Sequence, residues 1–307
     1  VNDGGDGFDA EAFLNSLEPI GWKLGLERME LLSDELGRPQ DSYATIHVVG
    51  TNGKSSVSRM ISAICEAHGY RSGSSLSPHL ARWSERVVVS GREEPELFGE
   101  CVQRTAEAAA RVNSRLDGEE VTQFELATAA AFLALAEAGV QVAAIEAGLG
   151  GRLDATNSIN SLATVLTSIG LDHTEYLGET ELEIAGEKLA VLRPGTVLVT
   201  GPLSPEVREL ARSTARERGC EIREVGRAEG HVLAHGALVA EPDVAGDLRR
   251  GGGGHRAVVG PDAGQGDHAR DVVADVGDDL DRHLLAGGQQ HQVVLVDPHD
   301  GAGRLLR

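Results

Sequence analysis

A glycine-rich segment with one lysine is the part of this sequence best suited to chemistry on phosphates. It follows an apolar run, Thr45 to Val49, and leads into an amphipathic segment that begins at Lys54. A strand, a glycine turn and a helix N-terminus form an anion site, because backbone N–H groups converge there and the helix dipole favours negative charge. A lysine adds a point charge that reaches the terminal phosphates of a nucleotide. The pattern predicts a nucleoside triphosphate site made of Gly50, Thr51, Asn52, Gly53, Lys54, Ser55 and Ser56.

The alternative interpretation of this segment is a plain strand-to-helix turn. If a nucleotide binds there with Mg²⁺, one of two neighbouring hydroxyls, Ser55 or Ser56, would contact the metal. The other would be an ordinary residue of the first helical turn, and the sequence leaves this choice open.

A second glycine-rich segment runs from Glu146 to Asn157, after the predicted strand Val140–Ile145. A carboxylate at a strand end is suited to hold Mg²⁺ or to orient a water molecule. The glycines of the segment would let a ligand approach the backbone closely. Arg152 and Asp154 are candidate ligand contacts, and an ion pair between the two is the alternative explanation for both.

Further candidates follow other predicted strands. His173 comes after Ala163–Thr167, at the same edge of the predicted sheet as the phosphate segment, and the alternative is a hydrogen-bonded surface histidine. Ser77, Pro78 and His79 form a loop that would close over phosphates or simply turn the chain.

Two more candidates lie in or near predicted helices. Lys188 falls in the helix Leu182–Leu192, although most lysines are solvated. Phe124 lies between Thr122 and Glu125, whose spacing is that of a capping box and needs no further explanation. We nevertheless expect Phe124 to line a pocket.

Strands alternate with helices from residue 8 to about 226, which predicts an α/β domain with a mostly parallel sheet and helices on both faces. Ligands of such sheets bind at the carboxyl ends of the strands, so the candidates above would share one crevice. Besides those already given, the predicted strands are Ala44–Val49, Arg71–Leu76, Glu85–Val89, Val197–Thr200 and Glu221–Val225. The predicted helices also include Phe8–Leu17, Leu24–Leu36, Lys54–His68, Pro95–Leu116, Thr122–Ala138 and Pro205–Arg218.

Composition narrows the classes of function. A formal net charge of −20 over 307 residues argues against non-specific binding to nucleic acid or to an anionic membrane. No apolar run approaches the ~18 residues of a membrane span, and the acidic N-terminal residues show no signal-peptide pattern. The three cysteines are far apart and lack metal-type spacing, which is typical of buried thiols in a reducing compartment. We therefore expect a cytoplasmic protein and a monomer.

The sequence changes character after about Arg227. From Ala228 onward it contains no Lys, Ser, Thr, Asn, Ile, Met, Cys, Phe, Tyr or Trp, and it includes the run Gly251–Gly254. A segment with so little side chain to pack is expected to be poorly ordered. The predicted organisation is thus an ATP-binding domain over residues 1–226 and an atypical tail over 227–307. We hypothesise that a shifted reading frame or a truncation produced the tail, and an intact frame in the underlying DNA would contradict this.

Taken together, the ordered segments resemble the folylpolyglutamate synthase/dihydrofolate synthase family, a branch of the Mur ligases. The resemblance covers about residues 8–226. Its order and spacing are more specific than any single motif. The segments that carry it are Gly50 to Lys54, Ser77 to Leu80, Glu85 to Val87, Thr122 to Glu125, Glu146 to Asn157, Thr167 to His173, and Glu187 with Lys188.

The resemblance implies a site for ATP with two Mg²⁺ ions. By resemblance, Ser77 and Glu146 would hold one Mg²⁺ at the phosphates, and His173 would ligate the second. Lys188 would be carbamylated by CO₂ and support the second metal, which fits a buried lysine whose pKa is lowered. Pro78, His79, Phe124, Arg152 and Asp154 would lie near the pterin-containing substrate. Ser55 stands where the family usually has glycine, and a helical backbone there would tolerate it.

The implied reaction is ATP-dependent amide formation, in which L-glutamate is added to dihydropteroate or to a reduced folate through an acyl phosphate. Lys54, His173 and Lys188 would be the catalytic residues. The family also has a second α/β domain with an Asp-Gly-Ala-His-Asn motif, which residues 228–307 do not show in recognisable form. The competing hypotheses are another Mur-type amino-acid ligase and a nucleotide-binding fragment without catalysis.

Overall fold

The structure is a computed structural model that describes residues 8–17, 25–225, 255–260, 272–276, 292–296 and 303–306. It divides into two units, Val1–Ala237 and Leu238–Arg307, and each is described separately.

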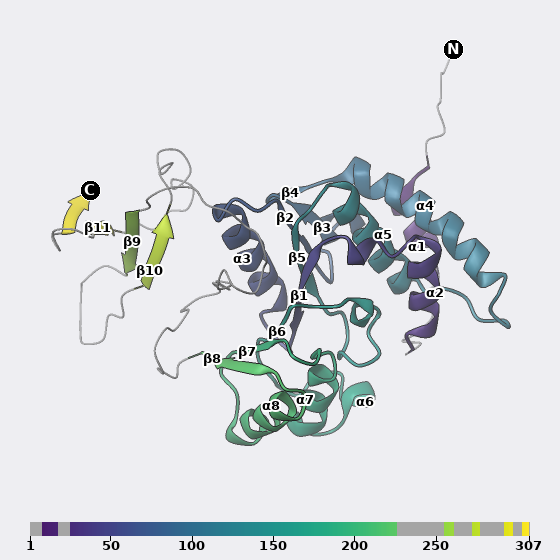
Figure 1. Ribbon diagram of the computed structural model, residues 1–307. Coiled ribbons are helices and arrows are strands. Elements are labelled where there is room, and N and C mark those ends of the chain that lie inside the picture. Colours follow the sequence, from purple (N-terminus) through teal and green to yellow (C-terminus); the bar gives the residue numbers. More distant parts are fainter. Residues whose placement is uncertain are drawn as a thin grey trace, which may run out of the picture. The chain divides into compact units, whose positions relative to one another are not determined.

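An eight-stranded sheet forms the first unit, in the order β4-β3-β2-β5-β1-β6-β7-β8 (Figure 1). The strands from β2 to β8 in this order are parallel, whereas β3 and β4 add an antiparallel edge. This confirms the predicted α/β class and the mostly parallel sheet. The bounds are β1 Ala44–Val49, β2 Ser72–Ser75, β3 Val87–Val89, β4 Arg92–Glu93, β5 Val142–Glu146, β6 Ala163–Leu166, β7 Val197–Thr200 and β8 Glu221–Glu224.

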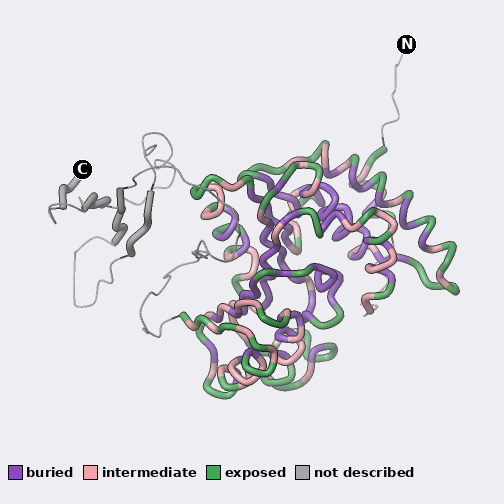
Figure 2. Tube along the Cα trace, in the orientation of Figure 1, coloured by how far each residue is buried: buried purple, intermediate pink, exposed green. Residues whose placement is uncertain are grey.

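Helices cover the sheet, and the central strands are buried (Figure 2). The helix α5 is apolar on nearly every side, and it packs in a core with α4 and the strands β3 and β5. A second core lies under α7 and α8. The helices are α1 Ala10–Ser16, α2 Glu27–Glu35, α3 Lys54–Ala67, α4 Pro95–Asn113, α5 Gln123–Glu137, α6 Thr174–Leu177, α7 Glu181–Leu189 and α8 Pro205–Glu217. Short 3₁₀ helices are η1 Pro39–Asp41, η2 Trp83–Arg86 and η3 Ala155–Ser158.

One local expectation was wrong, and one short helix was not predicted. The strand expected from Glu85 starts only at Val87, because residues 83–86 form η2, where the Glu85 carboxylate accepts backbone N–H bonds from Leu80, Ala81 and Arg82. The single turn α6 was not predicted, since four residues are too few to show helical periodicity.

The second unit contains a four-stranded antiparallel sheet in the order β10-β9-β11-β12. Its strands are β9 His255–Gly260, β10 Val272–Val276, β11 Gln292–Val296 and β12 Gly303–Leu306. The rest of the tail lies outside the described residues, so the expectation of a poorly ordered tail stays a prediction.

Candidate nucleotide and metal site

The phosphate loop leaves β1 at Gly50 and enters α3 at Lys54, as expected. Gly50 has φ of 146°, and a Cβ added there would lie 2.0 Å from Thr167 Oγ1, so no other residue fits without displacing that side chain. Gly53 caps α3 in the left-handed region. Lys54 Nζ donates to the carbonyls of Gly50 and Thr51 at 3.1 and 3.2 Å. The lysine is thus already folded over the loop.

The phosphate loop is hydrogen-bonded to the segment that follows β6. Thr51 N donates to Ser168 O at 2.8 Å, and Gly170 N donates to Thr51 Oγ1 at 3.1 Å. Thr167 Oγ1 donates to Asn52 O at 2.7 Å. These bonds join the loop to the segment that ends at His173.

His173 caps α6 with a left-handed backbone, φ 48°, and its side chain is about half exposed, 3.6 Å from Asp172. A left-handed conformation is uncommon for a residue with a side chain. The structure places His173 at the carboxyl end of β6, as predicted, and its role as a metal ligand stays a prediction.

Glu146, at the end of β5, connects the phosphate loop to the loop that follows β2. Its carboxylate accepts hydrogen bonds from Ser55 Oγ at 2.9 Å and from Ser77 N at 3.0 Å. Only 2% of Glu146 is exposed, and burial raises its pKa despite both bonds. Ser55, not Ser56, is therefore the hydroxyl beside this carboxylate, and its helical backbone is the conformation expected for a serine there.

Lys188 lies on α7 and is 4% exposed. Burial lowers its pKa to about 8, and the positive charge of Lys54 acts in the same direction. Asp172 and Asp154 act in the opposite direction, yet burial prevails. With this pKa, Lys188 is about half neutral at pH 8, and the neutral form has a nucleophilic amine.

The Gly148–Asn157 loop packs directly on α7. A Cβ on Gly151 would lie 2.7 Å from the carbonyl oxygen of Glu187 and 3.0 Å from the Cα of Lys188. Arg152 Nε donates to the Glu187 carboxylate at 2.9 Å. The alternative pair of Arg152 with Asp154 is thus wrong, because Arg152 turns outward to α7.

Asp154 holds this loop together from inside. Its carboxylate accepts N–H bonds from Leu149 at 2.7 Å and Thr156 at 3.0 Å, while burial raises its pKa. Phe124 lies against the same loop, with its ring tip 2.4 Å from the position of a Gly148 Cβ. The structure therefore brings Phe124 and Asp154 together, and their contact with substrate stays a prediction.

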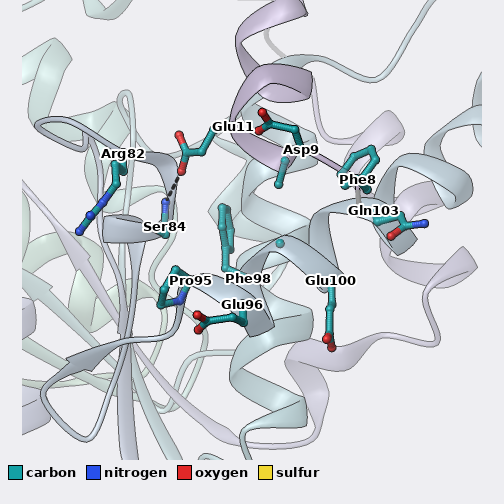
Figure 3. Close-up of a pocket in the computed structure, with 12 residues that line it drawn as sticks. Phe8, Asp9, Glu11, Arg82, Ser84, Pro95, Glu96, Phe98, Glu100 and Gln103 are labelled. Carbon is teal, nitrogen blue, oxygen red and sulfur yellow. Dashed lines mark hydrogen bonds between the residues drawn. The ribbon is translucent and has the colours of Figure 1, made fainter. Parts of the chain in front are cut away.

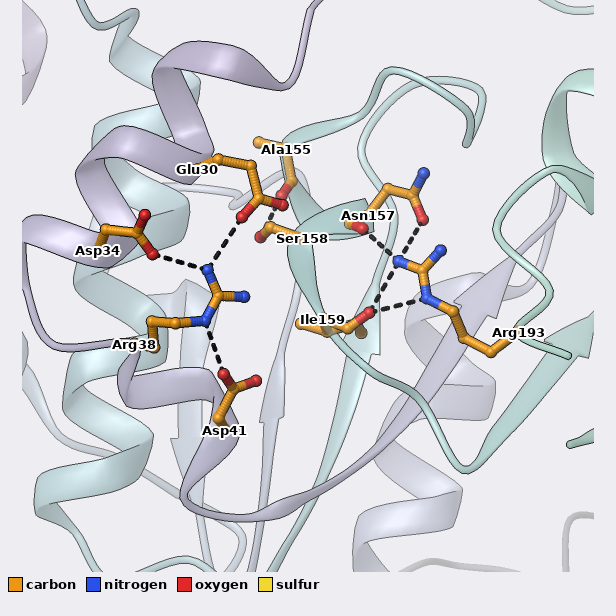
Figure 4. A network of polar contacts seen from close by, with 9 residues as sticks. All are labelled: Glu30, Asp34, Arg38, Asp41, Ala155, Asn157, Ser158, Ile159 and Arg193. Atoms are coloured by element: carbon orange, nitrogen blue, oxygen red, sulfur yellow. Dashed lines mark hydrogen bonds and ion pairs between the residues drawn. The ribbon is translucent and has the colours of Figure 1, made fainter.

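Residue types alone gave no role to His47 or Arg193. His47 on β1 is fully buried, its Nε2 lies 2.9 Å from Thr156 Oγ1, and burial lowers its pKa to about 3. Arg193 donates to the carbonyl of Ile159 and to the Asn157 side chain, so it fixes the end of the same loop (Figure 4). The one sequence signal for a role of His47 was the presence of a histidine in an apolar strand. Nothing in the sequence indicated the role of Arg193.

The loop after β2 carries Ser77, Pro78 and His79 and returns through η2. His79 Nδ1 accepts a hydrogen bond from Arg86 Nε at 3.0 Å, and its ring lies 4.5 Å from the Trp83 ring. Burial, and then the charge of Arg86, lowers the pKa of His79. Pro78 lies in this loop after a cis peptide bond.

A groove lies away from the phosphate loop, between α1, η2 and the start of α4 (Figure 3). Its volume is about 420 Å³. Glu11 on its wall accepts backbone N–H bonds from Trp83 and Ser84. The groove therefore belongs to the packing of α1 against η2, not to the candidate site.

The oxygen donors around Glu146 suit Mg²⁺. Within the described ranges, no group of three His, Cys, Asp or Glu side chains could hold a metal alone. Mg²⁺ is usually held by one or two carboxylates together with substrate phosphates. A buried carboxylate between Ser55 and Ser77, beside a phosphate loop, fits that arrangement.

Among the described helices, none has the length and apolar character needed to cross a bilayer.

Comparison with known families shows to which class of phosphate-loop proteins this chain belongs. Residues 48–238 match the family model of the Mur ligase middle domain. The chain belongs to the Mur ligase family. This confirms the resemblance noted in the sequence.

Similar members of the Mur ligase family are dihydrofolate synthase/folylpolyglutamate synthases. The protein of Mycobacterium tuberculosis is 40% identical over 60% of this chain and 41% of its own length. That of Bacillus subtilis is 35% identical over 70% of this chain and 50% of its own length. The chain thus spans about half of the length of these relatives.

Solved structures agree with this assignment. The Mycobacterium tuberculosis folylpolyglutamate synthase complexed with ADP and AMPPCP matches with a TM-score of 0.65 and 36% identity, over 70% of this chain and 49% of the other. A folylpolyglutamate synthase–AMPPCP–folate complex matches with a TM-score of 0.68 and 32% identity, over 71% and 53%. The Mur ligase domain described above is therefore homologous to that of ATP-dependent acid–amino acid ligases.

Proposed function

We propose that this protein is an ATP-dependent ligase that adds L-glutamate to dihydropteroate, to a reduced folate, or to both. The observation that supports this most directly is the hydrogen bond from Ser55 that joins the phosphate loop to Glu146. The buried Lys188 lies near enough to Lys54 for the charge of Lys54 to lower its pKa. The proposed substrates are taken from the relatives, which are named dihydrofolate synthase/folylpolyglutamate synthases.

The chemistry requires activation of a carboxylate. In the proposed reaction an oxygen of the acceptor carboxylate attacks the γ-phosphorus of ATP, the bond to the bridging oxygen breaks, and ADP leaves. The amine of glutamate then attacks the acyl carbon, loses a proton, and phosphate leaves with the electron pair of the C–O bond. Lys54 and the loop N–H groups stabilise the charge that develops on the phosphates.

Mg²⁺ and a carbamylated lysine belong to this proposal. Glu146, with Ser77, would hold one Mg²⁺ at the phosphates, and His173 with Lys188 would hold the second. When bound, Mg²⁺ polarises the phosphoryl oxygens and neutralises developing charge. Since a lysine must be neutral to react with CO₂, the lowered pKa of Lys188 favours carbamylation.

The test is ADP release from the full chain with Mg-ATP, L-glutamate and either dihydropteroate or tetrahydrofolate. We expect ADP release that requires both glutamate and one of the two acceptors. Lys54→Ala is expected to abolish it, because the ammonium that contacts the terminal phosphates is removed. Release with a UDP-muramoyl acceptor instead would assign the chain to another Mur-type ligase.

A nucleotide-binding role without catalysis is the second candidate, because residues 228–307 do not show the Asp-Gly-Ala-His-Asn motif in recognisable form. Mg-ATP binding without acceptor-dependent ADP release would support it. A cytoplasmic location and a monomeric state stay predictions.

A further inference from the structure

Arg86 is a largely buried arginine that the proposed reaction has not yet used. Its Nε donates to His79 Nδ1 at 3.0 Å, and its guanidinium lies 4.3 Å from the centre of the Trp83 ring. Among the described residues, no carboxylate lies within ion-pair distance of it. Burial lowers its pKa to about 10, and the charge of Glu146 opposes this shift. A buried cation without a contacting anion is costly unless a ligand supplies one.

The surroundings of Arg86 hold it in place before any ligand arrives. Trp83, which stacks on the guanidinium, donates its backbone N–H to Glu11 at 3.0 Å and its indole N–H to Asn15 at 2.9 Å. The helix α1 therefore anchors the ring on which Arg86 rests. With the plane and one edge of the guanidinium fixed, its two terminal nitrogens have no hydrogen-bond partner among the described residues and are available to a planar anion.

The strand order separates Arg86 from the phosphate loop. Arg86 precedes β3, and its carbonyl accepts a hydrogen bond from Leu76 N, next to Ser77 at the end of β2. Glu146 ends β5 and the phosphate loop follows β1, in the strand order β3-β2-β5-β1. At ~4.8 Å per strand, the backbone of β3 lies about 14 Å from that of β1, and β5 with Glu146 lies between them. An anion bound at Arg86 is therefore expected to be a group other than the phosphates held by the loop.

The crevice beside Arg86 is small, with a volume of about 10 Å³, and it brings charged and aromatic side chains together. It is lined by Arg86 together with Ser77, Phe124, Glu146 and Thr156. Its lining includes an aromatic ring, the Glu146 carboxylate and the guanidinium. A carboxylate group that enters the crevice would lie near Arg86 and near Glu146.

We propose that Arg86 binds the carboxylate of the acceptor, as a two-point contact that fixes its approach to the nucleotide. This assignment rests on the proposed function, and it deepens that function by naming the group that recognises the reacting end of the acceptor. The ring of Trp83 and the imidazole of His79 act as positioning groups for Arg86.

The test compares binding of two probes to the full chain in the presence of Mg-ADP. One probe is dihydropteroate, and the other is its analogue with aniline in place of aminobenzoate, which lacks only the carboxylate. Isothermal titration would measure the Kd of each for wild type, Arg86→Gln and Arg86→Lys. Arg82→Gln is the matched control, since Arg82 is 64% exposed and pairs with Glu93.

We expect Arg86→Gln to weaken dihydropteroate by on the order of 10–100-fold, as for loss of a charged hydrogen-bond pair. The analogue and Mg-ADP should bind with unchanged Kd. Arg86→Lys should lose less affinity for dihydropteroate, because lysine keeps the positive charge but lacks the paired donors of the guanidinium. Arg82→Gln should change nothing.

Equal losses for both probes, or dihydropteroate binding by Arg86→Gln as tight as by wild type, would overturn the assignment. Weaker Mg-ADP binding in Arg86→Gln would overturn it too, because it would assign the anion to the nucleotide. If Arg86→Gln does not fold, Arg86→Lys decides by the same ratio of the two probes. Wild type that binds Mg-ADP but neither dihydropteroate nor tetrahydrofolate would contradict the proposed acceptor itself, whereas failure in the variants alone contradicts only the role of Arg86.

Discussion

At the residue scale, titratable side chains around the phosphate loop are held away from water. His47, Asp154 and Lys188 are each at most 4% exposed, and burial is the largest cause of each pKa shift. Burial disfavours the charged form, so the pKa of the histidine and the lysine falls and that of the aspartate rises. Each shift makes stability or reactivity depend on pH in a defined direction.

His47 should make the fold sensitive to acid. Its pKa is about 3 when folded, against 6.5 ordinarily, so the unfolded chain takes up a proton first as pH falls. The stability it contributes is present above pH 6.5 and is lost toward pH 3. The raised pKa of Asp154 acts in the opposite sense, because its folded form binds a proton more readily. Urea unfolding of wild type and His47→Asn across this range should show a flatter pH slope in the variant, and parallel slopes would contradict the prediction.

Lys188 should become carbamylated as pH rises through about 8, the pKa to which burial lowers it. At pH 8 about half of it is neutral, against roughly one in 300 for an ordinary lysine. At constant dissolved ¹³CO₂, a ¹³C NMR carbamate signal is expected to grow across this pH range. The chain has three lysines, Lys23, Lys54 and Lys188, so the signal is readily assigned by its loss in Lys188→Arg. A signal that survives in this variant would place the carbamate elsewhere.

At the element scale, the loop that follows β5 is fixed on several sides at once. Asp154 binds its backbone from inside, Arg193 holds its end, and Gly151 lets it lie on α7. These contacts come from elements that are distant in the sequence. The loop therefore sets the place of Lys188 relative to the phosphate loop.

Gly151→Ala should separate this loop from α7. Its Cβ would lie 2.7 Å from a backbone oxygen, and backbone cannot yield as a flexible side chain can. We expect a loss of stability of about 1–3 kcal/mol, typical of overpacking. Gly186→Ala in α7 itself is the matched control, since nothing lies within 4 Å of its Cβ. It should stabilise the fold by about 0.5–1 kcal/mol, and equal urea midpoints for the two variants would contradict the packing argument.

The strands and helices were largely predictable because their periodicity is local. Val197–Thr200 and Ala44–Val49 have the predicted bounds, and Lys54 begins its helix as expected. The partners of the site residues were not predictable. Three hydrogen bonds depend on which elements pack together, namely those of Arg152 with Glu187, Ser55 with Glu146 and Arg193 with Asn157. Sequence patterns indicate at which edge of the sheet the site residues lie, whereas their hydrogen-bond partners depend on how the elements pack.

At the scale of the whole molecule, the domain over residues 1–226 and the tail over 227–307 should differ in resistance to protease. The first has two cores beneath its helices, whereas residues 228–307 offer few large side chains. Trypsin is expected to cut first after arginines of the tail, such as Arg249 and Arg270, and to leave a fragment that ends near Arg227. Mass spectrometry of a time course would identify it. Early cuts within residues 25–225 would contradict this expectation.

The position of β1 in the sheet also has a consequence for folding kinetics. The loop on β1 meets Glu146 across 91 positions of sequence, and β1 is flanked by β5 and β6, both formed from much later residues. Contacts so distant in sequence form slowly, so the nucleotide site is completed late. A nucleotide that binds only the completed site adds stability by mass action. Mg-ADP should therefore slow unfolding in stopped-flow measurements and leave the refolding rate unchanged.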